Sequence, residues 1–438
     1  MSKLQFQVEW ESPGSARGEE LRATWARLRI DVGGEPVTRV EDKRAGSVRD
    51  AVYGPIYPLA EWIATNWWRL LHEVVSPTRI ARNAYGRCHS LSSASEGFAL
   101  PCLKFHPEGE RIGLAWDPLD VPTTAVRFLA GGHRYVDRAE VTDSLWAFVS
   151  SVVARLEDQG CPNTLLAEEW SAIEACDTEE QEFCTLAARL GRDPYALSES
   201  QGLRIIKAAE SIPEAIREEF FSAADIHRFQ SQARTVSEWI HHARESDLQV
   251  EPLLALRASN SHLDRSRAPW EQGYRFARHL RRRLSLKDRL TRSETDLADA
   301  LGVDQQDWQA VTADRTDQFS FLDALVGVTA GGAPRFAMPP RSGRSSTFTL
   351  CRALFEYLHT GNAPAGLVAP IYSDRQKRNR AFAAEFLVPA SQLRRKIRGK
   401  VVTEDEIQDF AEHFGTSDFV VRHQIHNHGL AQLSSWTV

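Results

Sequence analysis

Two charged side chains stand one helical turn apart in the segment FTLCRALFEYLH, residues 348–359: Arg352 and Glu356, with Ala353 directly after the arginine. Side chains at positions i and i+4 of a helix lie on the same face, so such a pair can bind one ligand or each other. Arginine cannot ligate a metal because it stays protonated. The spacing therefore indicates a salt bridge across one turn of a helix.

Two further phrases follow this segment in the last third of the chain. They are RNRAFAAEFLVP (378–389) and IQDFAEHFGTSDFVVRHQIHNHG (407–429). In the order and spacing of these phrases, residues 270–438 resemble the ImmA/IrrE family of zinc metallopeptidases. In that family a phrase of the type F-x-L-A-H-E-L-G-H opens the active-site helix, and a second helix reads A-N-x-F-A-A-E-x-L-x-P. The most specific match is FAAEFLVP, residues 382–389.

The chemistry of that family needs two histidines at i and i+4 to hold one zinc ion, with a glutamate at i+1 as general base. Arg352, Ala353 and Glu356 occupy these positions. The family's third ligand is an acid just before the A-N-x-F-A phrase. At that point this chain has Gln376, Lys377, Arg378 and Asn379, and its nearest acid is Asp374. The resemblance therefore implies a vestigial site of Arg352, Ala353, Glu356 and Arg378, with no catalytic residue, metal or cofactor.

Two other stretches carry histidines that could do chemistry. His423, His426 and His428 lie in HQIHNH, but no cysteine or acid stands close beside them. We interpret them as polar residues at a helix end rather than as metal ligands. The phrase RHSLSSASEGF (87–97) combines His89 with several serines but lacks the G-x-S-x-G elbow of a hydrolase, so we predict a loop there.

Residues 403–429 are the best candidate for contact with DNA. Thr403 and Glu406 form a capping box that opens a helix, Gly415 ends this helix, and a second helix follows. So short a turn fits a helix-turn-helix. The residues expected to face phosphates or base edges from the second helix are Arg422, His423, His426 and Asn427. The first helix carries five acids, Glu404, Asp405, Glu406, Asp409 and Glu412. A helical pair that only completes the fold is therefore the other interpretation.

A basic helix provides a second candidate surface. The segment RFARHLRRRLSLKDR, residues 275–289, is rich in arginine, and Arg278, Arg281 and Arg282 could contact nucleic acid or an acidic partner. Such a run also serves as the solvated face of an amphipathic helix.

The elements that position these residues fall into four predicted regions. Residues 1–158 form an α+β domain. Its strands are indicated by LQFQVEW and by hairpins around Gly33-Gly34 and HPEGE, and its helices by the apolar stripe from Tyr57 and by residues 142–157. Residues 159–269 read as helical.

Residues 270–402 are expected to form a mixed, zincin-like domain, as the resemblance implies. It begins with a helix near Trp270, and a glycine- and proline-rich loop or edge segment (331–346) precedes the helix that starts near Thr347. Residues 403–438 are the helix-turn-helix-like tail. The predicted fold class is thus α+β throughout.

Composition narrows the class of protein. Of the 438 residues, 42% are hydrophobic and 26% charged, as in an ordinary globular protein, and the formal net charge of −6 argues against a polycation that coats nucleic acid. No stretch approaches 18 apolar residues, and MSKLQFQVEW has no apolar run, so we expect neither a membrane span nor a signal peptide. Six scattered cysteines indicate free thiols in a reducing cytoplasm.

The leading hypothesis is a non-catalytic pseudo-peptidase that regulates bacterial stress response, mobile elements or phage defence by binding a protein. The resemblance implies a partner of repressor type, because family members cleave helix-turn-helix repressors. Two alternatives stay open: an active metallopeptidase with unrecognised ligands, and a DNA-binding regulator acting through residues 403–429. The sequence leaves open the partner, the role of the N-terminal domain and the oligomeric state.

Overall fold

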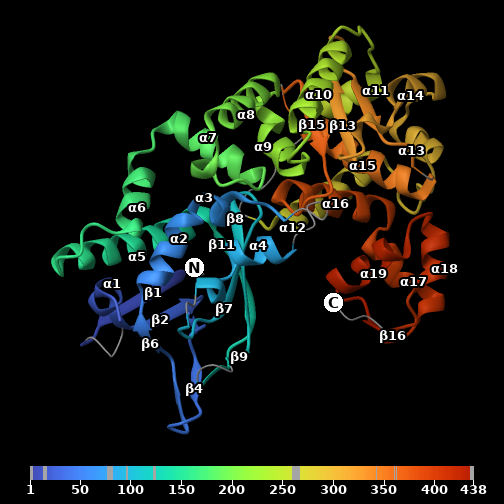
Figure 1. Ribbon diagram of the computed structural model, residues 1–438. Helices are drawn as coiled ribbons and strands as arrows, with labels where there is room; N and C mark the ends of the chain where they lie inside the picture. Colours follow the sequence, from blue (N-terminus) through green and yellow to red (C-terminus); the bar gives the residue numbers. More distant parts are fainter. Residues whose placement is uncertain are drawn as a thin grey trace. The chain divides into compact units, whose positions relative to one another are not determined.

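The computed structural model describes residues 3–12, 17–75, 82–94, 97–121, 125–258, 267–341, 343–359, 361 and 363–434. It divides the chain into two compact units, Met1–Ile205 and Ile206–Val438, and the division falls within helix α8 (Glu199–Ser211) (Figure 1). Where the structure describes residues 159–269, the regular elements are helices, as expected, but they belong to both units. In the described part of the chain, no helix has the length and apolar character needed to cross a bilayer.

The first unit is an α+β structure of antiparallel strands and helices. Its strands are β1 (Leu4–Trp10), β2 (Trp25–Val32), β3 (Glu35–Pro36), β4 (Val40–Asp42), β5 (Ser47–Arg49), β6 (Val52–Pro55), β7 (Cys102–Pro107), β8 (Arg111–Asp117), β9 (Leu119–Val121), β10 (Val126–Phe128) and β11 (Gly132–Asp137). Its helices are α1 (Glu19–Ala23), α2 (Tyr57–Thr65), α3 (Trp67–His72), α4 (Arg82–His89), η1 (Leu91–Ala94), α5 (Arg138–Asp158), α6 (Leu165–Ala175), α7 (Thr178–Arg189) and η2 (Pro194–Ala196).

Among the described residues of this unit, the strands form three small sheets. In the first, β2 lies between β1 on one side and β3 and β6 on the other; the other two have the orders β5-β4-β10-β9 and β11-β8-β7. Helix α5 packs against β1, β8 and β11, so the apolar faces of the first and third sheets share one core with it. The strand predicted at LQFQVEW and both predicted hairpins are confirmed.

Two predictions for the first unit are wrong. The helix predicted from Tyr57 is two helices, α2 and α3, interrupted at Asn66, whose side-chain amide donates to the carbonyl of Trp62 (2.8 Å). The loop predicted at 87–97 is the end of α4 followed by η1, with residues 95–96 outside the described residues. Both ring nitrogens of buried His89 lie 2.9 Å from backbone carbonyls, so its contacts tie the backbone together.

The second unit combines helices with one four-stranded sheet. Its helices are α9 (Glu214–Ala223), α10 (Phe229–Arg244), α11 (Glu251–Ala258), α12 (Pro269–Arg283), α13 (Glu294–Leu301), α14 (Gln305–Val311), η3 (Asp317–Phe319), α15 (Gly343–His359), α16 (Asp374–Leu387), α17 (Ala390–Lys396), α18 (Glu404–Phe414) and α19 (Asp418–Asn427). Its strands are β12 (Asp314–Arg315), β13 (Ala324–Val328), β14 (Pro334–Met338), β15 (Ala365–Val368), β16 (Val401–Val402) and β17 (Gln432–Leu433).

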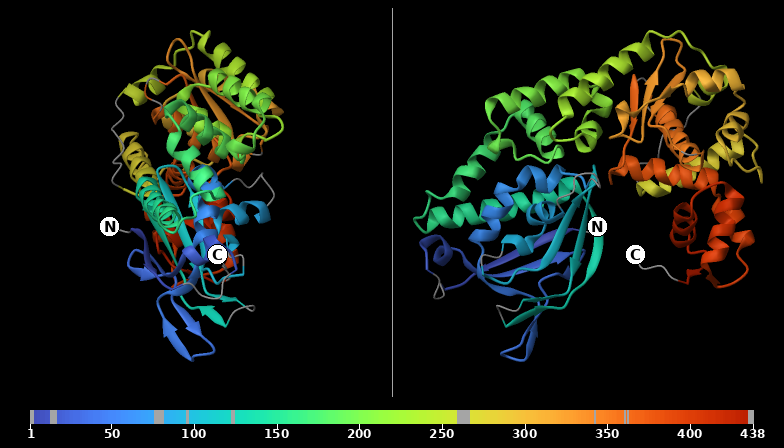
Figure 2. Two further views of the ribbon diagram at one scale, coloured as in Figure 1. Left: turned by 60° about the vertical axis from the view of Figure 1, so that its left-hand side comes forward. Right: turned by 45° about the vertical axis from the view of Figure 1, so that its right-hand side comes forward.

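The main sheet of this unit has helices on both faces, and its strand order is β12-β14-β13-β15 (Figure 2, strands in orange). Ala324 and Val326 of β13 belong to the core that contains α15. Gly327 points the other way, where an added Cβ would lie 2.8 Å from Ala243 of α10. Side chains alternate across a strand, so the sheet separates α15 from α10.

The loop or edge segment predicted at 331–346 is wrong in part. Residues 334–338 form β14, which lies inside the sheet between β12 and β13. Phe336, Ala337 and Met338 are fully buried, and this short apolar run explains the strand in spite of the flanking glycines and prolines. Helix α15 then begins at Gly343, four residues earlier than predicted.

Helices α12 and α16 cross at very close range. The point of contact is Gly273, where an added Cβ would lie 2.3 Å from the carbonyl oxygen of Arg378 and 2.9 Å from the amide nitrogen of Phe382. Only a glycine allows two helix backbones to approach so closely. This crossing fixes the helix that carries the FAAEFLVP phrase.

Candidate functional site

Helix α15 carries the two charged residues singled out by the sequence, and it lies in the interior. Every residue from Thr349 to Leu358 is buried, and Arg352 and Glu356 retain 4% and 3% of their exposure. A helix buried on all sides requires that its polar side chains find partners inside the protein. The contacts of these two residues therefore define the chemistry of the site.

Arg352 uses its guanidinium to bind four groups from three elements. Its Nη1 donates to Asp323 Oδ2 (2.6 Å), just before β13, and its Nε donates to Asn379 Oδ1 (2.8 Å) on α16. Its Nη2 donates to the carbonyl of Ala369 (3.1 Å) and to Gln376 Oε1 (3.0 Å). A guanidinium offers five N–H groups in a fixed plane, and most of them are used here.

Glu356 binds a different set of residues. Its Oε2 accepts from Nε (2.8 Å) of Arg375 and lies 2.7 Å from Nη2 of the same residue, while its Oε1 accepts from Asn379 Nδ2 (3.0 Å). The salt bridge predicted between Arg352 and Glu356 is therefore wrong. The arginine pairs with Asp323 and the glutamate with Arg375, because the carboxamide of Asn379 lies between them, accepting from one and donating to the other.

A second ring of contacts holds α16 in place around this network. Ser373 is the N-cap of α16, and its hydroxyl also donates to Glu219 Oε1 (2.5 Å) on α9. Gln376 Nε2 donates to the other oxygen of Glu219 (3.0 Å) and to the carbonyl of Leu367 (3.0 Å). The network thus joins α9, α15, α16 and the ends of β13 and β15.

Charge pairing sets the ionisation of the network. Burial raises the pKa of Asp323, but Arg352 and Arg341 beside it outweigh this, and the pKa is lowered from its ordinary value. Burial and the nearby guanidinium of Arg352 lower the pKa of Arg380 to about 10. Both groups therefore remain charged at neutral pH.

The other two predicted members of the site play smaller parts. Ala353 is fully buried in the hydrophobic core, where it offers no group for proton transfer. Arg378 is half-buried on α16, next to Asn379. The α16 side chains that bind Arg352 and Glu356 are those of Arg375, Gln376 and Asn379. Among the described residues, no three His, Cys, Asp or Glu side chains gather as a metal centre would require.

Helices α18 and α19 form the pair predicted at residues 403–429. The capping box of Thr403 and Glu406 is confirmed, and Gly415 ends α18 in the left-handed conformation (φ 67°). Val421 and Ile425 of α19 are fully buried. The two helices therefore pack through the residues that the sequence indicated.

The four side chains expected to project from α19 differ in their contacts. Both terminal nitrogens of Arg422 bind the carboxylate of Glu404 on α18, so its charge is compensated. His423 packs its ring against Phe419 (4.2 Å between centroids), and burial lowers its pKa. His426 and Asn427 are exposed, and the Asn427 amide donates to the hydroxyl of Tyr274 (3.1 Å).

The predicted basic helix is α12, and two of its three candidate arginines have internal partners. Arg278 donates to Glu385 Oε1 (2.8 Å), and buried Arg281 donates to the carbonyls of Phe386, Lys287 and Arg289. Arg282 is exposed. Of the three candidates, Arg281 is buried, whereas Arg278 and Arg282 remain exposed on the helix surface.

Glu385, from the FAAEFLVP phrase, is the second polar centre of this unit. Its carboxylate accepts from Arg278, from Gln424 Nε2 (3.0 Å) and from the amide of Ala390 (3.3 Å), and it lies 3.2 Å from His428 Nε2. Burial raises its pKa, but the side chains of His428 and Arg278 beside it outweigh this and lower it. His428 therefore joins the end of α19 to α16 as a structural residue, and no local pattern in the sequence indicates this pairing.

Comparisons with protein-family models, with curated proteins and with solved structures find no match to this chain.

Proposed function

We propose that this protein is a non-catalytic pseudo-peptidase that acts as a regulatory or interaction protein by binding a protein partner. Bacterial stress response, mobile-element control and phage defence are the settings that the resemblance to ImmA/IrrE peptidases implies. A partner of repressor type follows from the same resemblance.

One observation carries the non-catalytic part of the proposal. At the positions where the resemblance expects two zinc-binding histidines, Arg352 and Glu356 are bound by Asp323, Asn379 and Arg375, all from this chain. Ala353 offers no base at the intervening position. Polar atoms that are already hydrogen-bonded and buried cannot take a substrate or a metal without breaking these contacts.

The alternative of a DNA-binding regulator is less well supported by the contacts of α19. Arg422, the one arginine among its four candidate residues, is paired with Glu404, and α18 beside it is acidic. Phosphate binding depends on uncompensated positive charge.

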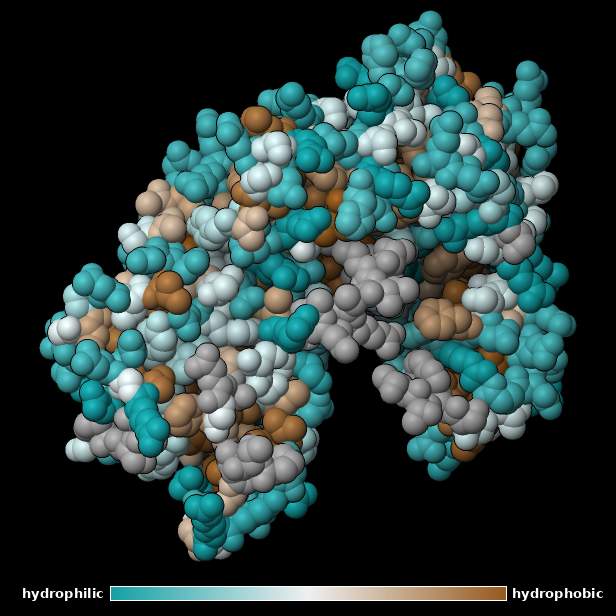
Figure 3. Space-filling model, in the orientation of Figure 1, coloured by the Kyte–Doolittle hydropathy of each residue, from teal (hydrophilic) through white to brown (hydrophobic). Residues whose placement is uncertain are grey.

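On the face drawn in Figure 3, the molecule shows mostly hydrophilic residues with hydrophobic ones in small groups.

The test combines a metal measurement with a cleavage assay on the full chain. We expect far less than one zinc per chain after purification without chelators, and no cleavage of a repressor encoded beside the gene, with or without added zinc. The control is a variant carrying Arg352→His, Ala353→Glu and Glu356→His, which supplies the family's two histidines and glutamate. About one zinc per chain in the unmodified protein, or cleavage that a chelator abolishes, would favour an active metallopeptidase.

Partner binding needs its own measurement. We expect the repressor to bind the full chain without being cut, and a labelled duplex from its operator not to bind the chain alone. Duplex affinity that falls steeply with salt and weakens in Arg422→Ala would favour the DNA-binding alternative.

A further inference from the structure

Strand β1 forms the outer edge of the first sheet. The amide of Gly33 donates to the carbonyl of Lys3 (2.9 Å), and the amide of Glu11 donates to the carbonyl of Trp25 (3.0 Å). Residues 3 and 11 therefore face the neighbouring strand β2, as do the odd-numbered residues between them, because backbone groups alternate along a strand. The even-numbered residues turn their amides and carbonyls to the open edge.

The carbonyl of Leu4 shows that this edge faces helix α5. It accepts a hydrogen bond from the Ser144 hydroxyl (2.7 Å), which closes one end of the edge. The amides and carbonyls of Phe6 and Val8 have no hydrogen-bond partner among the described residues. A strand edge with unpaired backbone groups is a template for another strand.

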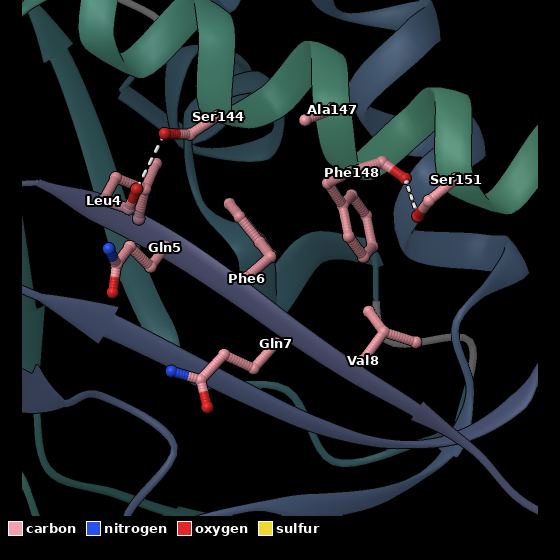
Figure 4. A pocket seen from close by; sticks show the side chains of 9 residues that line it. All are labelled: Leu4, Gln5, Phe6, Gln7, Val8, Ser144, Ala147, Phe148 and Ser151. Carbon is pink, nitrogen blue, oxygen red and sulfur yellow. Dashed lines mark hydrogen bonds between the residues drawn. The ribbon is translucent and has the colours of Figure 1, made fainter.

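A groove of about 580 Å³ runs between this edge and α5. Figure 4 shows residues 4–8 on one side and the helix residues Ser144, Ala147, Phe148 and Ser151 on the other. Phe6 and Phe148 stack with their ring centroids 4.6 Å apart and form an apolar floor. Ala147 and Ser151 form the rim of the groove on the helix side, and both are exposed. Because their side chains are small, they leave the groove open.

Charges of opposite sign flank the groove along α5. Exposed Asp143 lies one turn before Ala147 on the same face, and Arg155 lies one turn after Ser151 with its guanidinium 5.2 Å from the ring centre of Trp10. Twelve helical residues separate these charges, about 18 Å, and the seven residues of β1 span about 20 Å. The two charges thus lie about one strand length apart.

We propose that the edge of β1 binds an extended segment of a partner protein by strand addition. The segment is about five to seven residues long and pairs its backbone with Phe6 and Val8. It places an uncharged side chain over Phe148, a basic residue near Asp143 and an acidic residue near Arg155. This inference concerns the first unit and does not depend on the site around Arg352.

The probes are two acetylated and amidated heptapeptides, Lys-Val-Thr-Val-Thr-Val-Glu and its reverse, Glu-Val-Thr-Val-Thr-Val-Lys. Calorimetry on the full chain should show that one of the two peptides binds several-fold more tightly than the other. In the strand direction that the edge accepts, only that peptide places its lysine near Asp143 and its glutamate near Arg155. Along the bound peptide, every second amide faces β1 and donates to it. N-methylation of these amides should abolish binding, whereas N-methylation of the amides that face away should change the affinity little.

Two variants test the groove at β1. A third variant is a control, which shows whether a tryptophan placed on an exposed helix surface affects binding by itself. Val8→Pro removes an amide that has no partner, which an edge strand tolerates, and Ala147→Trp fills the groove. Val8→Pro should weaken peptide binding by about tenfold, as expected for the loss of one backbone hydrogen bond. Ala147→Trp should weaken it by at least as much, because the indole occupies the groove. Ala172→Trp, at an exposed position of α6, should bind as the unmodified chain does.

Three results would overturn the proposal. The first is that neither heptapeptide binds at millimolar concentration. The second is that Val8→Pro and Ala147→Trp remain folded by circular dichroism and bind with unchanged affinity. The third is a dimer of the full chain that Val8→Pro dissociates, because the occupant would then be a second copy.

Discussion

Replacing Arg352 with alanine removes the guanidinium at the centre of the buried network. Asp323, whose side chain is 12% exposed, then keeps Arg341 (2.7 Å) as an ionic partner. Asn379 Oδ1 loses the donor that Arg352 supplied, whereas Gln376 Oε1 still accepts from the amide of Ala369 (3.0 Å). The loss is thus concentrated on one carboxylate and one amide oxygen.

The magnitude follows from these remaining contacts. Removing one partner of a buried ion pair costs about 3–5 kcal/mol when nothing compensates the other. Because Arg341 still binds Asp323, the lower end applies, and we expect Arg352→Ala to lower the free energy of unfolding by about 3 kcal/mol. The loss should appear at neutral pH, where Asp323 is charged.

A pair of double-mutant cycles, measured by chemical denaturation, tests the partner assignment. Arg352→Leu combined with Asp323→Leu removes both charges of one pair and should recover about 1.5–3 kcal/mol relative to the sum of the single changes. Arg352→Leu combined with Glu356→Leu should be closer to additive, because Asp323 then loses Arg352 and Arg375 loses Glu356 as two separate pairs. Stronger coupling of Arg352 to Glu356 than to Asp323 would refute the reasoning.

Two further predictions concern pH and packing. Burial lowers the pKa of His359 from 6.5 to about 4, so the unfolded chain takes up a proton that the folded chain refuses. The free energy of unfolding should therefore decline as pH falls from about 6.5 to 4, by at most about 3 kcal/mol. When unfolding is measured across this pH range, the decline should be smaller in His359→Leu. An unchanged decline would show that other groups cause it. Gly273→Ala should lower the free energy of unfolding by about 1–3 kcal/mol or more, because its Cβ would lie 2.3 Å from a carbonyl of α16, and an unchanged melting temperature would contradict the crossing described.

Much of the fold could be predicted from local patterns. Alternation over LQFQVEW gave β1, and the Thr403–Glu406 capping box with Gly415 gave the bounds of α18, because each signal lies within a few neighbouring residues. The predictions of secondary structure were wrong where contacts between distant segments determine the local structure. The segment 334–338 became an internal strand through its pairing with β12 and β13, which glycine and proline content could not reveal.

The candidate site could be located from the sequence but its partners could not. The i, i+4 spacing placed Arg352 and Glu356 on one face of a helix, but it showed neither that they are buried nor which residues pair with them. Their ionic partners come from residues 29 positions before Arg352 and 19 positions after Glu356. Asp323 has only one local signal, a lone acid in front of the apolar run ALVGV, and Glu219 has none. Long-range pairing of this kind depends on how the sheet and helices pack.

The network around Asn379 links helix α15 to helix α16 through hydrogen bonds. Under the proposed function, the resemblance implies that a zinc ion makes this link in the active peptidases. In this chain the carboxamide of Asn379 makes that link by accepting from Arg352 and donating to Glu356. Asp323 pairs with Arg352 and Arg375 pairs with Glu356, so each of the two charges on α15 has an ionic partner within the chain. A buried set of paired charges contributes little net stability over apolar residues, and each member is costly to remove alone. Such a network holds the helices in one arrangement, and its buried polar atoms already bind within the chain, as the proposed non-catalytic role requires.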